Sequence, residues 1–332
     1  MTTADTAQSG SAMDAARAIA GDIKLAHSVF ALPFAVLGMV WAGAWRLERA
    51  AEPAGLSWPW AVPGVGVRWW ELGLILVCMV AARTVAMTMN RWADAAIDAG
   101  NPRTAARAIP AGKVSARAVL VAGAGAAAVF VVACGGFGLL GWNPWPLLLS
   151  PLVLIWLAGY AYAKRFTAWC HVVLGVALAM SPVAAALAIA PGYVVSGEGA
   201  GVWWLAGFVL LWVAGFDVIY ATADEAFDRA EGLHSLPAAL GTGGALWVSR
   251  AMHAGAMGCL IAATMTAWGG AGVPVVWWAG VALTAALIAT EHAVVWRAER
   301  RQDPKLLDAA FFTANGVIAV VLGVCGVVGL VV

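Results

Sequence analysis

The sequence predicts an all-α membrane protein, and both its composition and its pattern indicate this class. Hydrophobic residues make up 63% of the 332 residues and charged residues only 11%, whereas a soluble domain carries about 25% charged residues. The apolar runs approach the ~20 residues that a helix needs to cross ~30 Å of hydrocarbon, and they lack the ~10-residue alternation of membrane β-barrel strands. A soluble core could not bury this much apolar surface, so we expect the chain to lie in a lipid bilayer.

Nine apolar segments can be marked, and each is predicted to form one membrane-spanning helix. The connections between them include residues 47–68, rich in Pro, Gly and Trp, and residues 98–114. We expect residues 1–21 to form a disordered cytosolic tail and residues 22–332 to form a single transmembrane domain. The nine segments are residues 28–46, 69–97, 115–140, 144–163, 169–190, 202–223, 244–268, 273–296 and 309–331.

The Lys and Arg residues of the connections predict how the chain is oriented. Every even-numbered connection contains them, as Lys164 and Arg165 illustrate, whereas three of the four odd-numbered connections contain none. Basic connections remain in the cytoplasm. We therefore expect a multi-pass protein of the inner (plasma) membrane, with its N-terminus in the cytoplasm and its C-terminus outside.

The cysteines and histidines indicate neither a disulfide framework nor a zinc site. The five cysteines are scattered, mostly inside apolar runs, and form no C-x-x-C pair. The histidines lack the H-x-x-x-H and H-E-x-x-H spacings of zinc enzymes. We expect His253, Glu291, His292 and Asn315 to make hydrogen bonds between helices, and we assign no substrate contact to His171.

Two acidic stripes lie at the predicted cytosolic ends of the second and sixth segments. Residues three, four and seven apart share one helix face. Aligning Asp94 with Asp224, and Asp98 with Asp228, places both stripes just before a basic, Pro-containing loop, which indicates two related halves that each give an acidic face to one central cavity. The stripes run from the second segment into the residues just after it, with Arg83, Asn90, Asp94 and Asp98, and likewise from the sixth, with Asp217, Tyr220, Asp224 and Asp228.

The chemistry of these stripes predicts a magnesium–diphosphate site. Carboxylates near hydrocarbon are costly and usually mark function, and several of them together repel unless cations compensate their charge. Mg²⁺ prefers oxygen ligands and often combines one or two carboxylates with substrate phosphates. Two stripes would hold two or more Mg²⁺ ions bridged by a diphosphate whose lipid tail runs between the helices. Cations that could take the remaining phosphate charge are Lys24, Arg103, Lys164 and Arg165.

Other interpretations of these residues exist. An isolated Asp at a helix end is usually a solvated charge, and the matched pair of stripes argues against that. Arg83, deep in the second segment, could form a structural ion pair with Asp217. An ion-coupled transporter also suits acidic membrane helices in two halves. Its site would lie near the midplane, however, whereas these acids gather at one edge beside basic residues.

The motifs resemble those of the UbiA superfamily of intramembrane prenyltransferases. "NRWADAAID" resembles the N-x-x-x-D-x-x-x-D motif of the family's helix 2, and "DVIYATADEAFD" resembles the second acidic motif on helix 6. "YAYAKRFT" resembles the Y-x-x-x-K-R signature after helix 4, and "KLAHSVFALPFAVLG" resembles helix 1. The resemblance covers about residues 22–330. It is nearest to the 4-hydroxybenzoate polyprenyltransferase branch, including the variant associated with menaquinone made through futalosine.

The resemblance implies nine transmembrane helices around a central cavity and a role for each matched residue. It makes Arg83 the contact for an aromatic acceptor, and Tyr160 and Tyr220 part of the cavity wall. Asp217 would support the magnesium–diphosphate residues. It implies phosphate contacts from Arg103, Lys164 and Arg165. The magnesium and catalytic residues that it implies are Asn90, Asp94, Asp98, Asp224 and Asp228.

The expected function is a Mg²⁺-dependent transfer of a polyprenyl chain from a polyprenyl diphosphate to an aromatic acceptor. The acceptor would be 4-hydroxybenzoate or a related hydroxybenzoate or naphthoate, in ubiquinone or menaquinone biosynthesis. The alternatives are a prenyltransferase acting on haem, chlorophyllide or a glycerol-phosphate lipid, and an ion-coupled transporter. The partners would be the two substrates and the lipid bilayer, and we expect no nucleic acid and no obligatory protein partner.

Overall fold

The structure is a computed structural model that describes residues 21, 30–50, 59–268, 272–301 and 305–331, without the side chains of residues 298–312 and 331. Nearly all of the tail predicted at residues 1–21 lies outside the described residues. The predicted phosphate contact Lys24 lies outside them as well.

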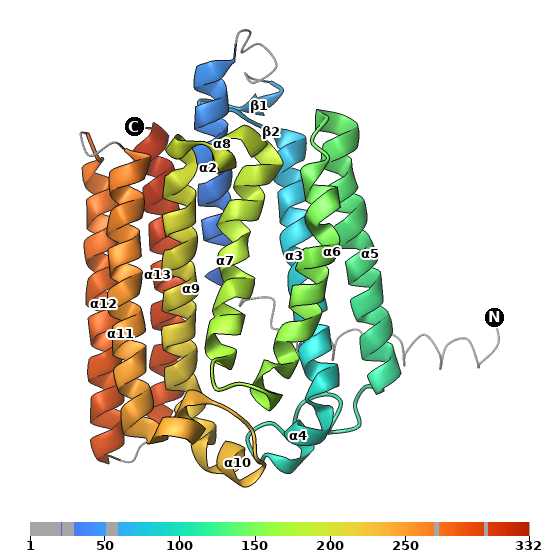
Figure 1. The fold of residues 1–332 in the computed structure, drawn as a ribbon, viewed down its shortest axis with the longest axis vertical. Helices are drawn as coiled ribbons and strands as arrows, with labels where there is room; N and C mark the ends of the chain where they lie inside the picture. Colours follow the sequence, from blue (N-terminus) through green and yellow to red (C-terminus); the bar gives the residue numbers. More distant parts are fainter. Residues whose placement is uncertain (1–20, 22–29, 51–58, 269–271, 302–304, 332) are drawn as a thin grey trace, which may run out of the picture.

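Long helices that run side by side make up most of the described chain (Figure 1). Seven helical stretches of the described residues are long and apolar enough to cross a membrane, and they include all of the long helices except α2 and α11. This confirms the all-α membrane fold, while nine crossings stay a prediction. The long helices are α2 (Leu32–Arg49), α3 (Trp69–Ala93), α5 (Ala116–Gly141), α6 (Trp145–Gly159), α7 (Cys170–Ile189), α9 (Ala200–Ala221), α11 (Leu236–Ala267), α12 (Val275–Arg301) and α13 (Lys305–Val331).

Helix α11 begins eight residues before the segment predicted at 244–268 because its first turn is capped. The Ser235 side chain accepts a hydrogen bond from the Ala238 N–H, and Pro237 lies in the first turn, where its missing N–H costs nothing. The helix then kinks at Gly241, whose φ of 70° and ψ of 163° lie outside helical geometry. Only glycine adopts this backbone readily, so the kink separates the short first turn from the long body of the helix.

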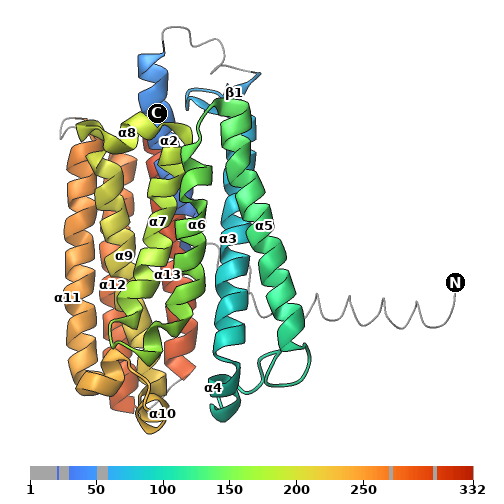
Figure 2. The same ribbon diagram turned by 45° about the vertical axis from the view of Figure 1, so that its right-hand side comes forward.

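Helix α9 lies at the centre of the main core. Its Trp212 is fully buried, stacks on Phe208 with ring centroids 5.8 Å apart, and meets Phe34 of α2 edge-on at 5.6 Å. Helices α7 and α11 pack against α9, and α2 packs against α7. Figure 2 shows α3 and α5 standing as a pair beside these helices. The two predicted acidic segments, α3 and α9, are thus carried by different parts of the bundle.

Hydrogen bonds between polar side chains join the helices of the core, as predicted. Trp212 Nε1 donates to Asn315 Oδ1 of α13 over 2.9 Å, and Asn315 Nδ2 donates to Glu291 Oε1 of α12 over 3.1 Å. His253 Nδ1 and His292 Nε2 lie 2.9 Å apart between α11 and α12. These bonds fix α12 and α13 against α9 and α11.

Residues 61–68, within the long connection predicted at 47–68, form a small hairpin. Strands β1 (Ala61–Val62) and β2 (Val67–Arg68) pair antiparallel. Just after β2, the buried Glu71 accepts two 2.7 Å hydrogen bonds from the Arg46 guanidinium and one from the Arg68 N–H. This ion pair ties α2, the hairpin and α3 together at one end of the bundle. The short elements α8 (Pro191–Val195) and η4 (Gly197–Gly199) follow α7.

The opposite end of the bundle is built from four short helical elements. Helices α4 and α10 both lie there, far from the hairpin (Figure 1). The elements are α4 (Ala95–Gly100), η3 (Tyr160–Arg165), η5 (Thr222–Asp224) and α10 (Glu225–Ala230). All of them contain residues of the predicted site.

Candidate active site

Both acidic motifs interrupt their helix at the central aspartate. We call Asn90, Asp94 and Asp98 the first motif, and Tyr220, Asp224 and Asp228 the second motif. The backbone of Asp94, between α3 and α4, has φ −95° and ψ 6°, and that of Asp224, before α10, has φ −106° and ψ 4°. Each predicted stripe is therefore locally distorted at its central aspartate. Helical hydrogen bonds still continue through Asp94, because its N–H donates to the Asn90 carbonyl and its carbonyl accepts from the Asp98 N–H. The same break at aligned positions supports the relation between the halves.

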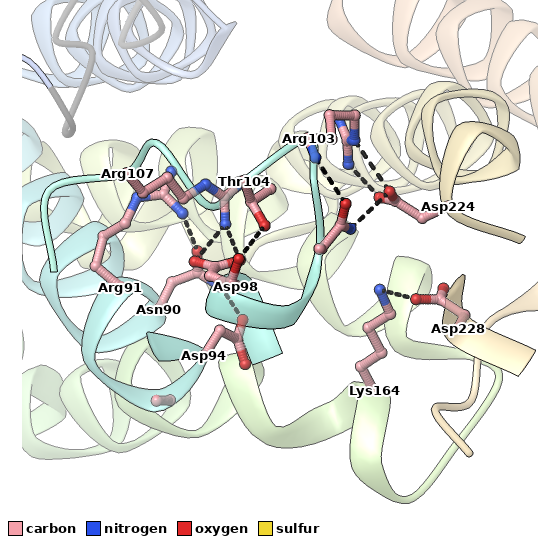
Figure 3. A network of polar contacts seen from close by, with 12 residues as sticks. Asn90, Arg91, Asp94, Asp98, Arg103, Thr104, Arg107, Lys164, Asp224 and Asp228 are labelled. Carbon is pink, nitrogen blue, oxygen red and sulfur yellow. Dashed lines mark hydrogen bonds and ion pairs between the residues drawn. The ribbon is translucent and has the colours of Figure 1, made fainter. Parts of the chain in front are cut away.

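The turn carries the last aspartate of each motif into the protein. Asp98 is only 5% exposed and Asp228 is completely buried. Figure 3 shows the acids of the first motif facing those of the second, with Arg103 reaching toward Asp224. The structure thus brings the two predicted acidic groups to the same end of the bundle.

The second motif is paired with cations that come from the first half of the chain. Arg103, in the loop after α4, donates from Nε to Asp224 Oδ1 over 3.0 Å and from Nη2 to Oδ2. Asn101 Nδ2 donates to the same Oδ1 over 3.0 Å. Lys164 Nζ of η3 lies 2.6 Å from Asp228 Oδ1. Asp228 has no hydrogen-bond donor in the described residues apart from this ion pair, so Lys164 alone compensates its buried charge.

The first motif is paired with two other arginines. Arg107 Nη1 donates to both carboxylate oxygens of Asp98, over 2.6 and 2.7 Å. Asp94 accepts a 3.0 Å hydrogen bond from Asn90 Nδ2, and its other oxygen lies 3.6 Å from Arg165 Nη2. Burial, reinforced by the nearby Asp98 carboxylate, raises the pKa of Asp94 above the usual aspartate value. A cation bound beside Asp94 would favour the ionised carboxylate and lower this pKa.

Arg103 also contacts the tyrosine of the second motif. Its Nη1 donates to the Tyr220 hydroxyl over 2.6 Å, and its guanidinium carbon lies 4.7 Å from the Tyr220 ring centroid. Arg103 is thus held by the carboxylate, the hydroxyl and the ring of the second half at once. A cation–π contact of this kind is worth about 0.5–1 kcal/mol at exposed sites.

Arg83, Tyr160 and Asp217, predicted respectively as the acceptor contact, a cavity-wall residue and a supporting residue, lie outside the two acidic motifs. Tyr160 begins η3, and its hydroxyl donates to the Ala86 carbonyl of α3 over 3.3 Å. Arg83 lies three residues before Ala86 on α3. Asp217 lies on α9, and its Oδ2 is 2.7 Å from His171 Nδ1 of α7. The hydrogen-bond partner found for the Asp217 carboxylate is therefore His171.

Three residues that the sequence did not assign to the site contact its acids. They are Asn101, Arg107 and His171. Arg107 could have been found, because it follows Asp98 by nine residues in the basic loop that was already assigned to the site. Asn101 and His171 give no local signal, since their partners are distant in sequence.

The donor set fits a metal that is shared with a ligand. In the described part of the chain, no three His, Cys, Asp or Glu side chains form a ready-made metal group. Mg²⁺ commonly takes only one or two carboxylates, with substrate phosphates and waters as its other ligands. The four aspartates offer such oxygens from two sides, and Asp228 has a buried oxygen without a donor. The residues therefore suit a metal–diphosphate complex that spans both motifs.

Comparison with known proteins agrees with this arrangement. Residues 53–316 match the model of the UbiA prenyltransferase family. A 4-hydroxybenzoate octaprenyltransferase from Alkalilimnicola ehrlichii is 30% identical over 272 residues, which cover 78% of this chain and 85% of that protein. One of the same name from Pseudoalteromonas atlantica is 30% identical over 204 residues, covering 58% of this chain and 67% of that protein.

Solved structures show the same fold. The apo structure of a UbiA homolog from Aeropyrum pernix K1 superimposes with a TM-score of 0.74 at 31% identity, over 92% of this chain and 98% of that one. A UbiA homolog from Archaeoglobus fulgidus bound to GPP and Mg²⁺ gives a TM-score of 0.60 at 16% identity, over 95% of this chain and 100% of that one. At that identity the second likeness concerns the fold alone.

Proposed function

The chain belongs to the UbiA prenyltransferase family, and from this premise we propose that it transfers a polyprenyl chain from a polyprenyl diphosphate to an aromatic acceptor in a Mg²⁺-dependent reaction. The acceptor that we propose is 4-hydroxybenzoate or a related hydroxybenzoate or naphthoate, in ubiquinone or menaquinone biosynthesis. The observation that carries the proposal is the meeting of two acidic motifs, from two halves, with cations that cross between them. The names of the curated relatives support the choice of acceptor.

We propose that substrate binding exchanges the partners of these charges. Arg103, Lys164 and Arg165 now contact carboxylates, and they can turn to the diphosphate oxygens, for which guanidinium and ammonium groups are good donors. Asn90, Asp94, Asp98, Asp224 and Asp228 would then hold Mg²⁺. When bound, the ion neutralises negative charge that develops on the departing diphosphate. Lys24, outside the described residues, would add a further phosphate contact.

The residues further along α3 and α9 are proposed to serve the acceptor. Arg83 would hold the acceptor's carboxylate, and Asp217 would accept a hydrogen bond from its hydroxyl. Ionisation breaks the allylic C–O bond and leaves its electron pair on the diphosphate. The ring carbon ortho to the hydroxyl then forms the new C–C bond, and the ring loses a proton. Tyr160 and Tyr220 would shield the allylic cation with their ring faces.

The topology that we propose follows from the location of the site. Residues 22–332 would act as one transmembrane domain of the inner membrane, with the acidic end and the N-terminus in the cytoplasm. The C-terminal end of α13 lies at the end of the bundle opposite α4 and α10 (Figure 1), which supports an external C-terminus. Cytosolic access is what a water-soluble diphosphate product requires.

An acceptor screen with one fixed donor tests this function. Purified protein in lipid nanodiscs is incubated with Mg²⁺, a radiolabelled prenyl diphosphate and each acceptor separately. We expect label on 4-hydroxybenzoate or on a related hydroxybenzoate or naphthoate, and none in excess EDTA. Label only on haem, chlorophyllide or a glycerol-phosphate lipid would reject the aromatic acid, and label on none of these acceptors would reject the enzyme.

A further inference from the structure

We propose that His171 is a positioning residue, which orients the carboxylate of Asp217 toward the hydroxyl of the aromatic acceptor. The inference rests on the proposed function and assigns a role to a histidine outside both acidic motifs. His171 lies in the first turn of α7, and Asp217 lies on α9. The 2.7 Å contact between them crosses the two helices.

The hydrogen bonds on the two ring nitrogens define the role of the imidazole. The Leu236 N–H, at the start of α11, points to His171 Nε2 over 3.4 Å. A backbone N–H can only donate, so Nε2 accepts and the proton of the neutral ring sits on Nδ1. Nδ1–H then donates to Asp217 Oδ2. This arrangement stabilises an ionised carboxylate and fixes its direction.

The exposure of the two side chains indicates that a ligand can reach Asp217 but not His171. The side chain of His171 is 3% exposed, whereas that of Asp217 is 27% exposed. A bound molecule could therefore contact Asp217 but not the imidazole behind it. Asp217 precedes Asp224 by seven residues, which is about 10 Å of helix on the same face. The predicted supporting role of Asp217 toward the metal is therefore replaced in this proposal by a role toward the acceptor, because Asp217 lies about two helical turns from Asp224.

The segment that contacts His171 also contacts Lys164, which belongs to the proposed diphosphate side of the site. The His234 N–H donates to the Lys164 carbonyl over 2.7 Å, and Leu236, which contacts His171, follows two residues later. Lys164 is the residue that pairs with Asp228. One short segment between α10 and α11 therefore holds both the cation of the second motif and the histidine behind Asp217, as a preorganised site requires.

The chemical step that His171 would support balances as a proton transfer. The hydroxyl proton of the acceptor passes to the carboxylate oxygen of Asp217 that His171 does not occupy, and the O–H electron pair stays on the acceptor oxygen. That pair activates the ortho ring carbon toward the allylic cation. The proton that the ring carbon loses on regaining aromaticity replaces the one taken from the hydroxyl, so one proton leaves for each diphosphate formed.

Two substitutions separate positioning from simple packing. The amide of Asn can stand where Nδ1–H stood, so His171→Asn keeps a donor to Asp217, whereas His171→Leu keeps volume and removes the donor. We expect His171→Leu to lower kcat/KM for 4-hydroxybenzoate by about tenfold or more, as loss of a charge-assisted or supporting hydrogen bond does. The KM for the prenyl diphosphate should stay within about twofold, and His171→Asn should restore most of the loss.

The outcomes are distinguishable from failure of the proposed function. Wild-type protein that prenylates no acceptor rejects the function, and this role with it. Active wild-type protein whose His171→Leu variant loses donor and acceptor parameters equally, or is not rescued by His171→Asn, rejects only the positioning role. If His171→Leu does not fold, His171→Gln takes its place, because its amide reaches the Nε2 position instead. ¹⁵N NMR of histidine-labelled wild-type protein should show His171 protonated at Nδ1, and a proton at Nε2 alone would overturn the inference.

Discussion

The two acidic motifs have the same backbone conformation at their central aspartate, but their compensating cations differ in where they come from. Both turn at their central aspartate with nearly the same φ and ψ, and both bury their last aspartate. The second motif has only Arg229 nearby in sequence, and Arg229 is bound to Glu225 over 3.0 Å and to the Ala238 carbonyl.

The first half therefore supplies the cations for both motifs. Arg103 and Lys164 cross to Asp224 and Asp228, while Arg107 and Arg165 serve Asp98 and Asp94. The two related halves therefore contribute differently: each provides an acidic motif, and the first half also provides the cations. Neither half alone balances its own charges, so the site depends on the junction between them.

The largest expected effect comes from removing the central aspartate of either motif. Asp94→Ala or Asp224→Ala should lower turnover by about a thousandfold or more, because each removes a charge aimed at the reacting diphosphate complex, while the protein remains folded. Prenyl transfer and thermal unfolding are measured in parallel. Glu48→Ala, an exposed acid at the hairpin end of the bundle, is the control and should retain full activity. Full activity of either aspartate variant in excess EDTA would remove the metal role.

The next prediction compares two cations near the second motif: Lys164, which comes from the first half of the chain, and Arg229, which follows Asp228 directly in sequence. Lys164→Met should destabilise the protein by about 3 kcal/mol, the lower end for breaking a buried pair, because it leaves Asp228 buried and uncompensated while 34% of the Lys164 side chain is exposed. Arg229→Met should change stability by less than about 1 kcal/mol, since its ion pair is more exposed. Denaturant unfolding measures both. Equal losses would show that the second half supplies its own charge balance.

Arg83→Ala should act on one substrate only. We expect the KM for a carboxylated acceptor to rise about tenfold, as loss of a hydrogen bond to a charged group does, with little change in the KM for the prenyl diphosphate. Initial rates with each substrate varied in turn provide the test. An equal rise in both constants would place Arg83 at the diphosphate.

The smallest effect concerns the hydroxyl that Arg103 contacts. Tyr220→Phe removes the 2.6 Å hydrogen bond and keeps the ring beneath the guanidinium. The KM for the prenyl diphosphate should rise by about three- to tenfold, which corresponds to one ordinary hydrogen bond. Tyr220→Leu, which also removes the ring, should raise it further. A Tyr220→Phe variant as impaired as Tyr220→Leu would assign the whole effect to the hydroxyl.

Much of the fold could be predicted because long apolar runs mark where the membrane helices lie. The segments predicted at 115–140 and 273–296 correspond to α5 and α12, within a few residues at most ends. The breaks at Asp94 and Asp224 could not be predicted, because a single non-helical residue hardly changes that pattern. The hairpin before Glu71 was missed because its strands are only two residues long.

For the site, the acidic residues could be predicted from the sequence, whereas most of their hydrogen-bond partners could not. The identities of the acids follow from their four-residue spacing and from the resemblance that this spacing carries. Their partners do not, because Arg103 and Asp224 lie 121 residues apart, and Asp217 and His171 lie 46 apart. Such pairs are decided by how the helices pack, which no local pattern records.

We propose that both acidic motifs bind one metal-bound diphosphate. Isothermal titration calorimetry with a non-hydrolysable prenyl thiolodiphosphate, with Mg²⁺ and with EDTA, tests it on wild-type protein, Asp94→Ala and Asp224→Ala. We predict Mg²⁺-dependent binding by the wild type that either substitution alone abolishes. Equal wild-type binding in EDTA, or loss of binding with only one of the two substitutions, would contradict a diphosphate shared across the halves.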